Sequence, residues 1–97
     1  MLNGRLFNIK NVQCYIKNIG DVQAHSQTVN HITFGKEMSS VNYAVLTSIV
    51  GLPQYWASCG VTTSDYNTDG FNIYAFNNGE SVCNNLYISW IAIEFAI

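Results

Sequence analysis

Few side chains in this sequence have the type and spacing that catalysis or metal binding requires. His25 and His31 are the two histidines, and no cluster of cysteines or carboxylates lies around them at zinc-site spacing. Asp65 and Asp69 flank a turn, where aspartate is favoured because its side chain hydrogen-bonds the backbone. The sequence has no nucleophile elbow, phosphate-binding loop or glycosidase carboxylate pair. We therefore expect no catalysis, no metal and no cofactor; His31 is a surface, subunit-contact or ligand-contact residue.

Ligand binding has better candidates. Tyr55 and Trp56 follow a Gly/Pro turn, and flat aromatic rings stack on the C–H surfaces of sugars. The polar loop of residues 77–85 supplies four asparagines and a glutamate, which hydrogen-bond hydroxyl groups. The predicted ligand-binding residues are Tyr55, Trp56, Asn77, Asn78 and Glu80. The alternative is an ordinary polar loop beside an aromatic pair packed at the rim.

The stretch of residues 86–95 must be a strand, and both of its faces are apolar. Leu86, Ile88, Trp90 and Ala92 point to one side, and Tyr87, Ser89, Ile91, Ile93 and Phe95 point to the other. A strand in a small sandwich normally has one wet face. We expect other copies of the chain to cover the second face, through the interface residues Tyr87, Ile91, Ile93 and Phe95. Glu94 is expected to be solvated or to meet a partner subunit.

Composition supports this interpretation. Of the 97 residues, 48% are hydrophobic and 10% are charged, against about 25% charged in typical soluble domains. Exposed apolar area that a small domain cannot cover is typical of obligate oligomers. The net charge of −2 and the lack of a basic run make nucleic acid an improbable partner. No apolar run is long enough for membrane insertion, and residues 1–5 lack the layout of a signal peptide.

The three cysteines, Cys14, Cys59 and Cys83, form no CxxC pair. Reduced cysteines that act as small hydrophobes are the favoured interpretation. One disulfide with a leftover thiol is the alternative, and the sequence does not choose which two would pair.

The rest of the chain predicts short strands separated by turns. Residues 5–9 and 12–16 have strand-like content, with a possible turn at Lys10-Asn11. Further strands are expected over residues 28–34, 43–50, within 55–66, over 71–76, and at 86–95. Asp69-Gly70 predicts a tight hairpin turn that uses a positive φ. The predicted fold is all-β, an antiparallel β-sandwich of about six strands. Residues 1–27 are a connector or extra strands, and residues 28–97 form the sandwich domain.

Four segments together resemble the H-type lectin domain and the related C-terminal domain of phage tail fibres. They are His31-Ile32-Thr33-Phe34, Tyr43-Ala44-Val45-Leu46, Thr68-Asp69-Gly70-Phe71 and Ile88-Ser89-Trp90-Ile91-Ala92-Ile93. The resemblance covers about residues 28–95. It implies a six-stranded sandwich that forms a homotrimer around a three-fold axis and binds carbohydrate near the subunit clefts without calcium.

This sequence departs from the animal lectins at two places. Asn78-Gly79 stand where some of them carry an aromatic–histidine pair, and residues 55–66 contain no basic residue. These departures favour the tail-fibre version. Our hypothesis is a trimeric receptor-binding tip of a phage or prophage tail fibre, extracellular and non-catalytic, that recognises a cell-surface glycan or other receptor. The alternatives are a free-standing secreted lectin and a structural trimerisation cap.

Overall fold

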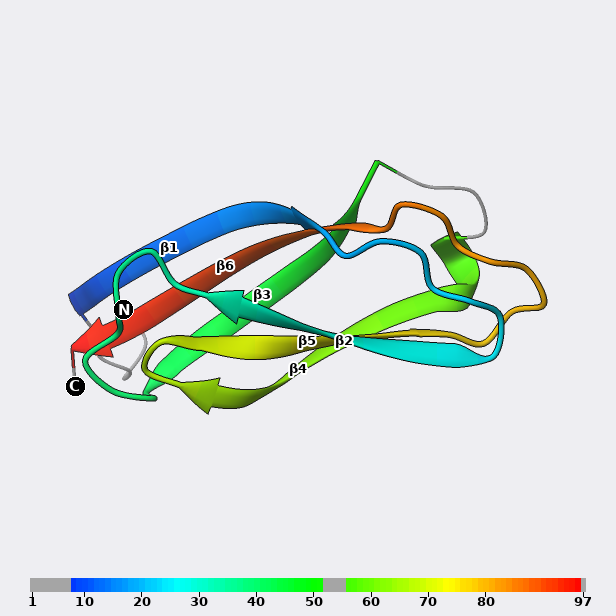
Figure 1. Cartoon of the computed structure of the whole chain (residues 1–97). Coiled ribbons are helices and arrows are strands. Elements are labelled where there is room, and N and C mark those ends of the chain that lie inside the picture. Colours follow the sequence, from blue (N-terminus) through cyan, green and yellow to red (C-terminus); the bar gives the residue numbers. More distant parts are fainter. Residues whose placement is uncertain (1–7, 52–55, 97) are drawn as a thin grey trace, which may run out of the picture.

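The computed structural model describes residues 8–51 and 56–96, and the side chain of Trp56 lies outside the description. Six antiparallel strands form two three-stranded sheets, shown as two layers in Figure 1. The β6 sheet has the order β1-β6-β3, and the β5 sheet has the order β2-β5-β4. The elements are β1 (Asn8–Asn18), β2 (Ser26–Thr33), β3 (Tyr43–Val50), the 3₁₀ turn η1 (Trp56–Ser58), β4 (Cys59–Asn67), β5 (Gly70–Asn77) and β6 (Tyr87–Ala96). The all-β antiparallel prediction is confirmed.

The first strand differs from its prediction. The sequence suggested two short strands with a turn at Lys10-Asn11, but β1 is one strand whose register shifts between Ile9 and Asn11. Ile9 lies opposite Phe95 and Asn11 lies opposite Glu94, so Lys10 is the extra residue of a β-bulge. β6 is long enough to pair with β1 on both sides of Lys10. This strand pairing outweighs the local preference of Lys10-Asn11 for a turn.

The core lies between the sheets. The inner face of β6 supplies Ile88, Trp90 and Ala92, which are buried on one side as the alternation predicted. The inner face of β5 supplies Phe71, Ile73 and Ala75, which are also buried. Four aromatic rings, those of Phe34, Tyr43, Phe71 and Trp90, pack at one end of this core. Phe71 and Trp90 meet edge to face with ring centroids 5.4 Å apart, a favourable arrangement for aromatic pairs.

The hairpin between β4 and β5 lies where Asp69-Gly70 predicted it, but for a different reason. The glycines with positive φ in the described ranges are Gly20 and Gly51, not Gly70. A Cβ at position 70 would lie 1.8 Å from the Ile32 carbonyl oxygen, so only glycine lets β5 approach β2 this closely. The left-handed conformation belongs instead to Asp65, with φ of 55°, in the register shift between Ser64 and Asn67.

Glu94 is neither solvated nor free to meet a partner, which makes that prediction wrong. Its side chain is 2% exposed and accepts hydrogen bonds from the loop after β2. The Ser39 hydroxyl donates at 2.6 Å, and the Ser39 and Ser40 amides donate at 3.1 Å. The Ser39 hydroxyl bond is the main cause, opposed by burial, that holds the pKa of Glu94 below its ordinary value of 4.5.

We predict that Glu94→Gln lowers the melting temperature at pH 7, because the ionised carboxylate is the form that the serines stabilise. A lowered folded-state pKa contributes stability above the ordinary pKa, and that contribution disappears as pH falls through the folded-state value. Thermal unfolding at pH 7 and pH 3 checks this: the difference from wild type should shrink at the lower pH. The exposed Glu37, changed to Gln, is the matched control and should alter neither melting temperature. A pH-independent deficit for Glu94→Gln would contradict the prediction.

Candidate functional site

The loop region that was predicted to bind a ligand lies at one end of the sandwich. The β1–β2 connection, η1 and the β5–β6 loop gather there, at the right of Figure 1. Backbone hydrogen bonds join them: Val22 pairs with Cys83 in both directions at 2.9 Å, and the Asn78 amide donates to the Ser58 carbonyl at 3.0 Å. The Asn85 amide donates to Asp21 Oδ1 at 2.9 Å. These loops therefore form one connected structure, which we call the loop end.

Asn77 holds the loop end together. Its side chain is 1% exposed. Asn77 Nδ2 donates to the carbonyls of Val22 (3.0 Å) and Ser81 (2.8 Å). Asn77 Oδ1 accepts from the Ser58 hydroxyl (2.9 Å) and the Gly79 amide (2.8 Å). An amide can make about four hydrogen bonds, so this side chain has no capacity left for a ligand.

Asn78 and Glu80 are exposed at the same end. Asn78 lines a shallow hollow of about 420 Å³ with His25, Ser26, Gln27 and Phe76. Glu80 Oε1 lies 3.0 Å from His25 Nε2, and both side chains are largely exposed. Of the other predicted ligand residues, Tyr55 lies outside the described residues and Trp56 is described only as the first residue of η1. The loop end thus presents an imidazole, a carboxylate and an amide to solvent.

A second polar cluster, which the sequence did not reveal, lies on the outer face of the β5 sheet. His31 and Asn72 are opposite each other in the β2–β5 register, with His31 Nδ1 2.8 Å from Asn72 Oδ1. Asn72 Nδ2 and the Tyr74 hydroxyl each donate to Asp65 Oδ2 at 3.0 Å. The Tyr74 bond, and then the Asn72 bond, lower the pKa of Asp65. These residues come from three strands, and only His31 had been identified as a ligand-contact candidate.

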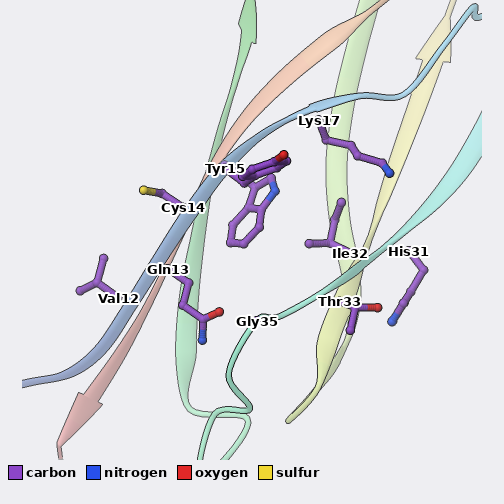
Figure 2. A pocket seen from close by; sticks show the side chains of 10 residues that line it. Val12, Gln13, Cys14, Tyr15, Lys17, His31, Ile32, Thr33 and Gly35 are labelled. Atoms are coloured by element: carbon purple, nitrogen blue, oxygen red, sulfur yellow. The ribbon is translucent and has the colours of Figure 1, made fainter.

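A larger hollow of about 740 Å³ opens at the edge of the sandwich between β1 and β2. We call it the edge cleft. It is lined by Val12, Gln13, Cys14, Tyr15, Lys17, His31, Ile32, Thr33, Gly35 and Trp90. In Figure 2, Gln13, Tyr15 and Lys17 point from β1 toward β2, and Val12 and Cys14 point to the opposite side of β1. The cleft exists because the inner face of β1 carries polar side chains that the β5 sheet does not cover.

The edge cleft contains features suited to a polar ligand. Tyr15 is 68% exposed, although it stands opposite the buried Trp90 in the β1–β6 register. The indole Nε1 of Trp90 is buried and has no hydrogen-bond partner among the described residues. Such a donor is costly to leave without an acceptor. Lys17 adds one of the four basic residues of the chain, and no carboxylate belongs to the described lining. The arrangement favours an acceptor-rich or anionic group beside an aromatic ring.

The outer face of the β6 sheet is apolar across all three strands, as the alternation of β6 predicted. The register places Ile9, Val12, Cys14, Ile16, Asn18, Ala44, Leu46, Ser48, Val50, Tyr87, Ser89, Ile91, Ile93 and Phe95 on this face. Leu46 is 61% exposed, Tyr87 43% and Ile91 37%, and Ile93 and Phe95 are half-buried. None of these residues is charged. In the described part of the chain, this face has no covering layer.

Two further classes of site are absent from the described residues. No group of three or more histidine, cysteine or acidic side chains there could hold a metal ion. No helix in the same residues has the length and hydropathy needed to cross a membrane.

We predict that Asn77→Ala lowers the free energy of unfolding by about 3 kcal/mol, because the buried groups around it lose their partners. Asn78→Ala, an exposed neighbour, should change it by less than about 0.5 kcal/mol. Denaturant unfolding of both variants at one protein concentration measures the contrast. Equal, small effects would show that the Asn77 network does not hold the loops.

Comparison with known proteins finds similarity at the level of three-dimensional structure. No model of a protein family matches the sequence, and a search of curated proteins finds no significant match. Two solved structures match over 84% of this chain with a TM-score of 0.65 and 20% sequence identity. One is a C-terminal fragment of the R1 pyocin fibre of P. aeruginosa, of which the match covers 22%, and the other is an N-truncated R1-type pyocin tail fibre, of which it covers 68%. This chain therefore has a fold found in R-type pyocin tail fibres.

Proposed function

We propose that this chain is a trimeric receptor-binding tip of a phage or prophage tail fibre, which recognises a cell-surface carbohydrate or other receptor and performs no catalysis. The observation that carries the proposal is the uncharged, exposed outer face of the β6 sheet on a fold shared with pyocin tail fibres. In this setting the protein is extracellular and belongs to the particle. A free-standing lectin and a structural cap are the other candidates, and a binding measurement separates the cap from the two receptor-binding candidates.

The outer face of the β6 sheet supports the proposal of assembly. Eleven of its fourteen residues are apolar or aromatic, and they come from three adjacent strands. A contiguous apolar patch of this kind marks an interaction surface. Three copies arranged around an axis would bury the Ile91 side of β6 and leave the β5 sheet facing outward. Burial of large apolar side chains contributes roughly 25 cal/mol per Å², so this face can supply the main driving force for assembly.

Receptor contact is best supported at the edge cleft. Tyr15 offers an exposed aromatic face, Trp90 belongs to the lining of the cleft, and Lys17 supplies a positive charge in a chain of net negative charge. Sugars combine such C–H and hydroxyl surfaces, and an acidic sugar also carries a negative charge. The loop end, with Asn78 and Glu80, is the second contact region. Three copies of a weak site on one rigid trimer would gain affinity through avidity.

We predict that Ile91→Asp yields monomer or aggregate, because a carboxylate would lie unpaired in a dry interface. Light scattering coupled to size-exclusion chromatography gives the oligomeric state. Val29→Asp is the matched control: Val29 is 52% exposed but lies on the β5 sheet, so that variant should remain trimeric. A trimer with Asp at position 91 would show that the outer face does not meet partners.

We predict that Tyr15→Ala and Lys17→Gln each weaken binding to receptor-bearing bacterial cells or to arrayed glycans by about tenfold, which corresponds to ~1.4 kcal/mol per site. Both side chains are exposed, so assembly should be unaffected. Asn78→Ala and Glu80→Gln test the loop end in the same assay. Weaker binding by Asn78→Ala and Glu80→Gln alone would place the receptor contact at the loop end. Undetectable binding by the wild-type trimer across cells and glycans would favour the structural cap.

A further inference from the structure

Two of the three cysteines meet at the loop end. Cys83 is fully buried and pairs with Val22 through two backbone hydrogen bonds of 2.9 Å. Cys59 is the first residue of β4, half-buried, and lies opposite Asn77 in the β4–β5 register. Its side chain packs against the core cluster that contains Cys83. Both are thiols in the structure.

The Asn77 side chain explains why these thiols are neighbours. It donates to the carbonyl of Val22, the residue opposite Cys83, and accepts from the hydroxyl of Ser58, the residue before Cys59. The Cys59 thiol neighbours the Cys83 thiol and contributes to raising its pKa. Packing, strand register and the Asn77 hydrogen bonds therefore bring the two cysteines together at the loop end.

The environments of the two thiols set an order of reaction. Burial, and then the neighbouring Cys59 thiol, raise the pKa of Cys83 to about 11. The reactive form of a cysteine is the thiolate, so Cys83 is a poor first nucleophile. Cys59 is half-buried at the start of β4 whereas Cys83 is fully buried, so Cys59 is the more accessible residue of the two.

We propose that Cys59 and Cys83 form a redox modification site, which a low-molecular-weight disulfide converts into an intramolecular disulfide. The Cys59 thiolate attacks one sulfur of the reagent, which forms a mixed disulfide and releases one reagent thiolate. The Cys83 sulfur then displaces the second reagent thiol, and the Cys83 proton passes to a released thiolate. The protein loses two electrons and two hydrogens, and the reagent becomes two thiols.

This bond would stabilise the loop end. It would join the start of β4 to the β5–β6 loop and close the chain between residues 59 and 83 into a ring, which restricts the unfolded state. The reaction suits a protein that leaves a reducing cytosol for an oxidising exterior, where disulfides persist. Formation of this disulfide requires no receptor. Failure to form the disulfide and failure of the tail-fibre proposal are therefore separate results.

Cys14 provides the control. It is exposed on the outer face of the β6 sheet, opposite Ile91, and away from the loop end. Cys14→Ser therefore removes the third thiol and leaves the pair intact. The experiment treats native wild type, Cys14→Ser and Cys14→Ser/Cys59→Ser with oxidised glutathione, without denaturant, and analyses each by intact mass and non-reducing peptide mapping.

We expect Cys14→Ser to lose two hydrogens, to yield a linked peptide pair that contains Cys59 and Cys83, and to melt on the order of 10 °C higher until a reductant is added. Wild type should give the same linked pair. It therefore replaces Cys14→Ser in this measurement if that variant folds poorly. The double variant should show neither the linkage nor the shift. A persistent glutathione adduct on Cys59, or a linkage that forms only in denaturant, would overturn the proposal.

Discussion

The central strand β6 is the constraint on which the rest of this structure depends. It pairs with β1 along one edge and with β3 along the other, so none of its backbone groups remains for another strand. Its alternate side chains must then be covered by layers. The β5 sheet covers Ile88, Trp90 and Ala92, and the described chain provides no second layer for the Ile91 side. An apolar face of this extent that no layer of the described chain covers is typical of an interaction surface.

Two buried polar side chains then fix the ends of the sandwich. Glu94, near the end of β6, binds the loop at Ser39 and Ser40, and Asn77, at the end of β5, binds three segments of the loop end. Because β5 and β6 end at opposite ends of the sandwich (Figure 1), each end receives one such anchor. Buried polar groups of this kind contribute to stability only when fully satisfied, and both are. These hydrogen bonds fix the loops against the ends of the two sheets.

The division of the surface follows from the same arrangement. One face is apolar and suited to assembly, while the edge cleft, the outer cluster around Asp65 and the loop end are polar. Fold similarity to pyocin tail fibres does not by itself identify what this chain binds, since unlike functions are carried by sites on shared folds. If the apolar face mediates assembly, as we propose, several distinct polar regions remain exposed for contact with a receptor.

The sequence by itself determined the strand content and the two faces of β6, because period-two alternation and turn residues are local properties. It also located the hairpin before Gly70, although the reason for glycine there, the nearby Ile32 carbonyl, depends on how β2 meets β5. Only the tertiary structure decided which polar residues are buried and which partners they contact. Asn77 and Asn78 are neighbours of the same type, yet one is a buried anchor and the other faces solvent. Glu94, Cys59 and Cys83 acquire their partners from segments distant in sequence. Hydrogen bonds and thiol contacts depend on such long-range register, which no local pattern of residue types specifies.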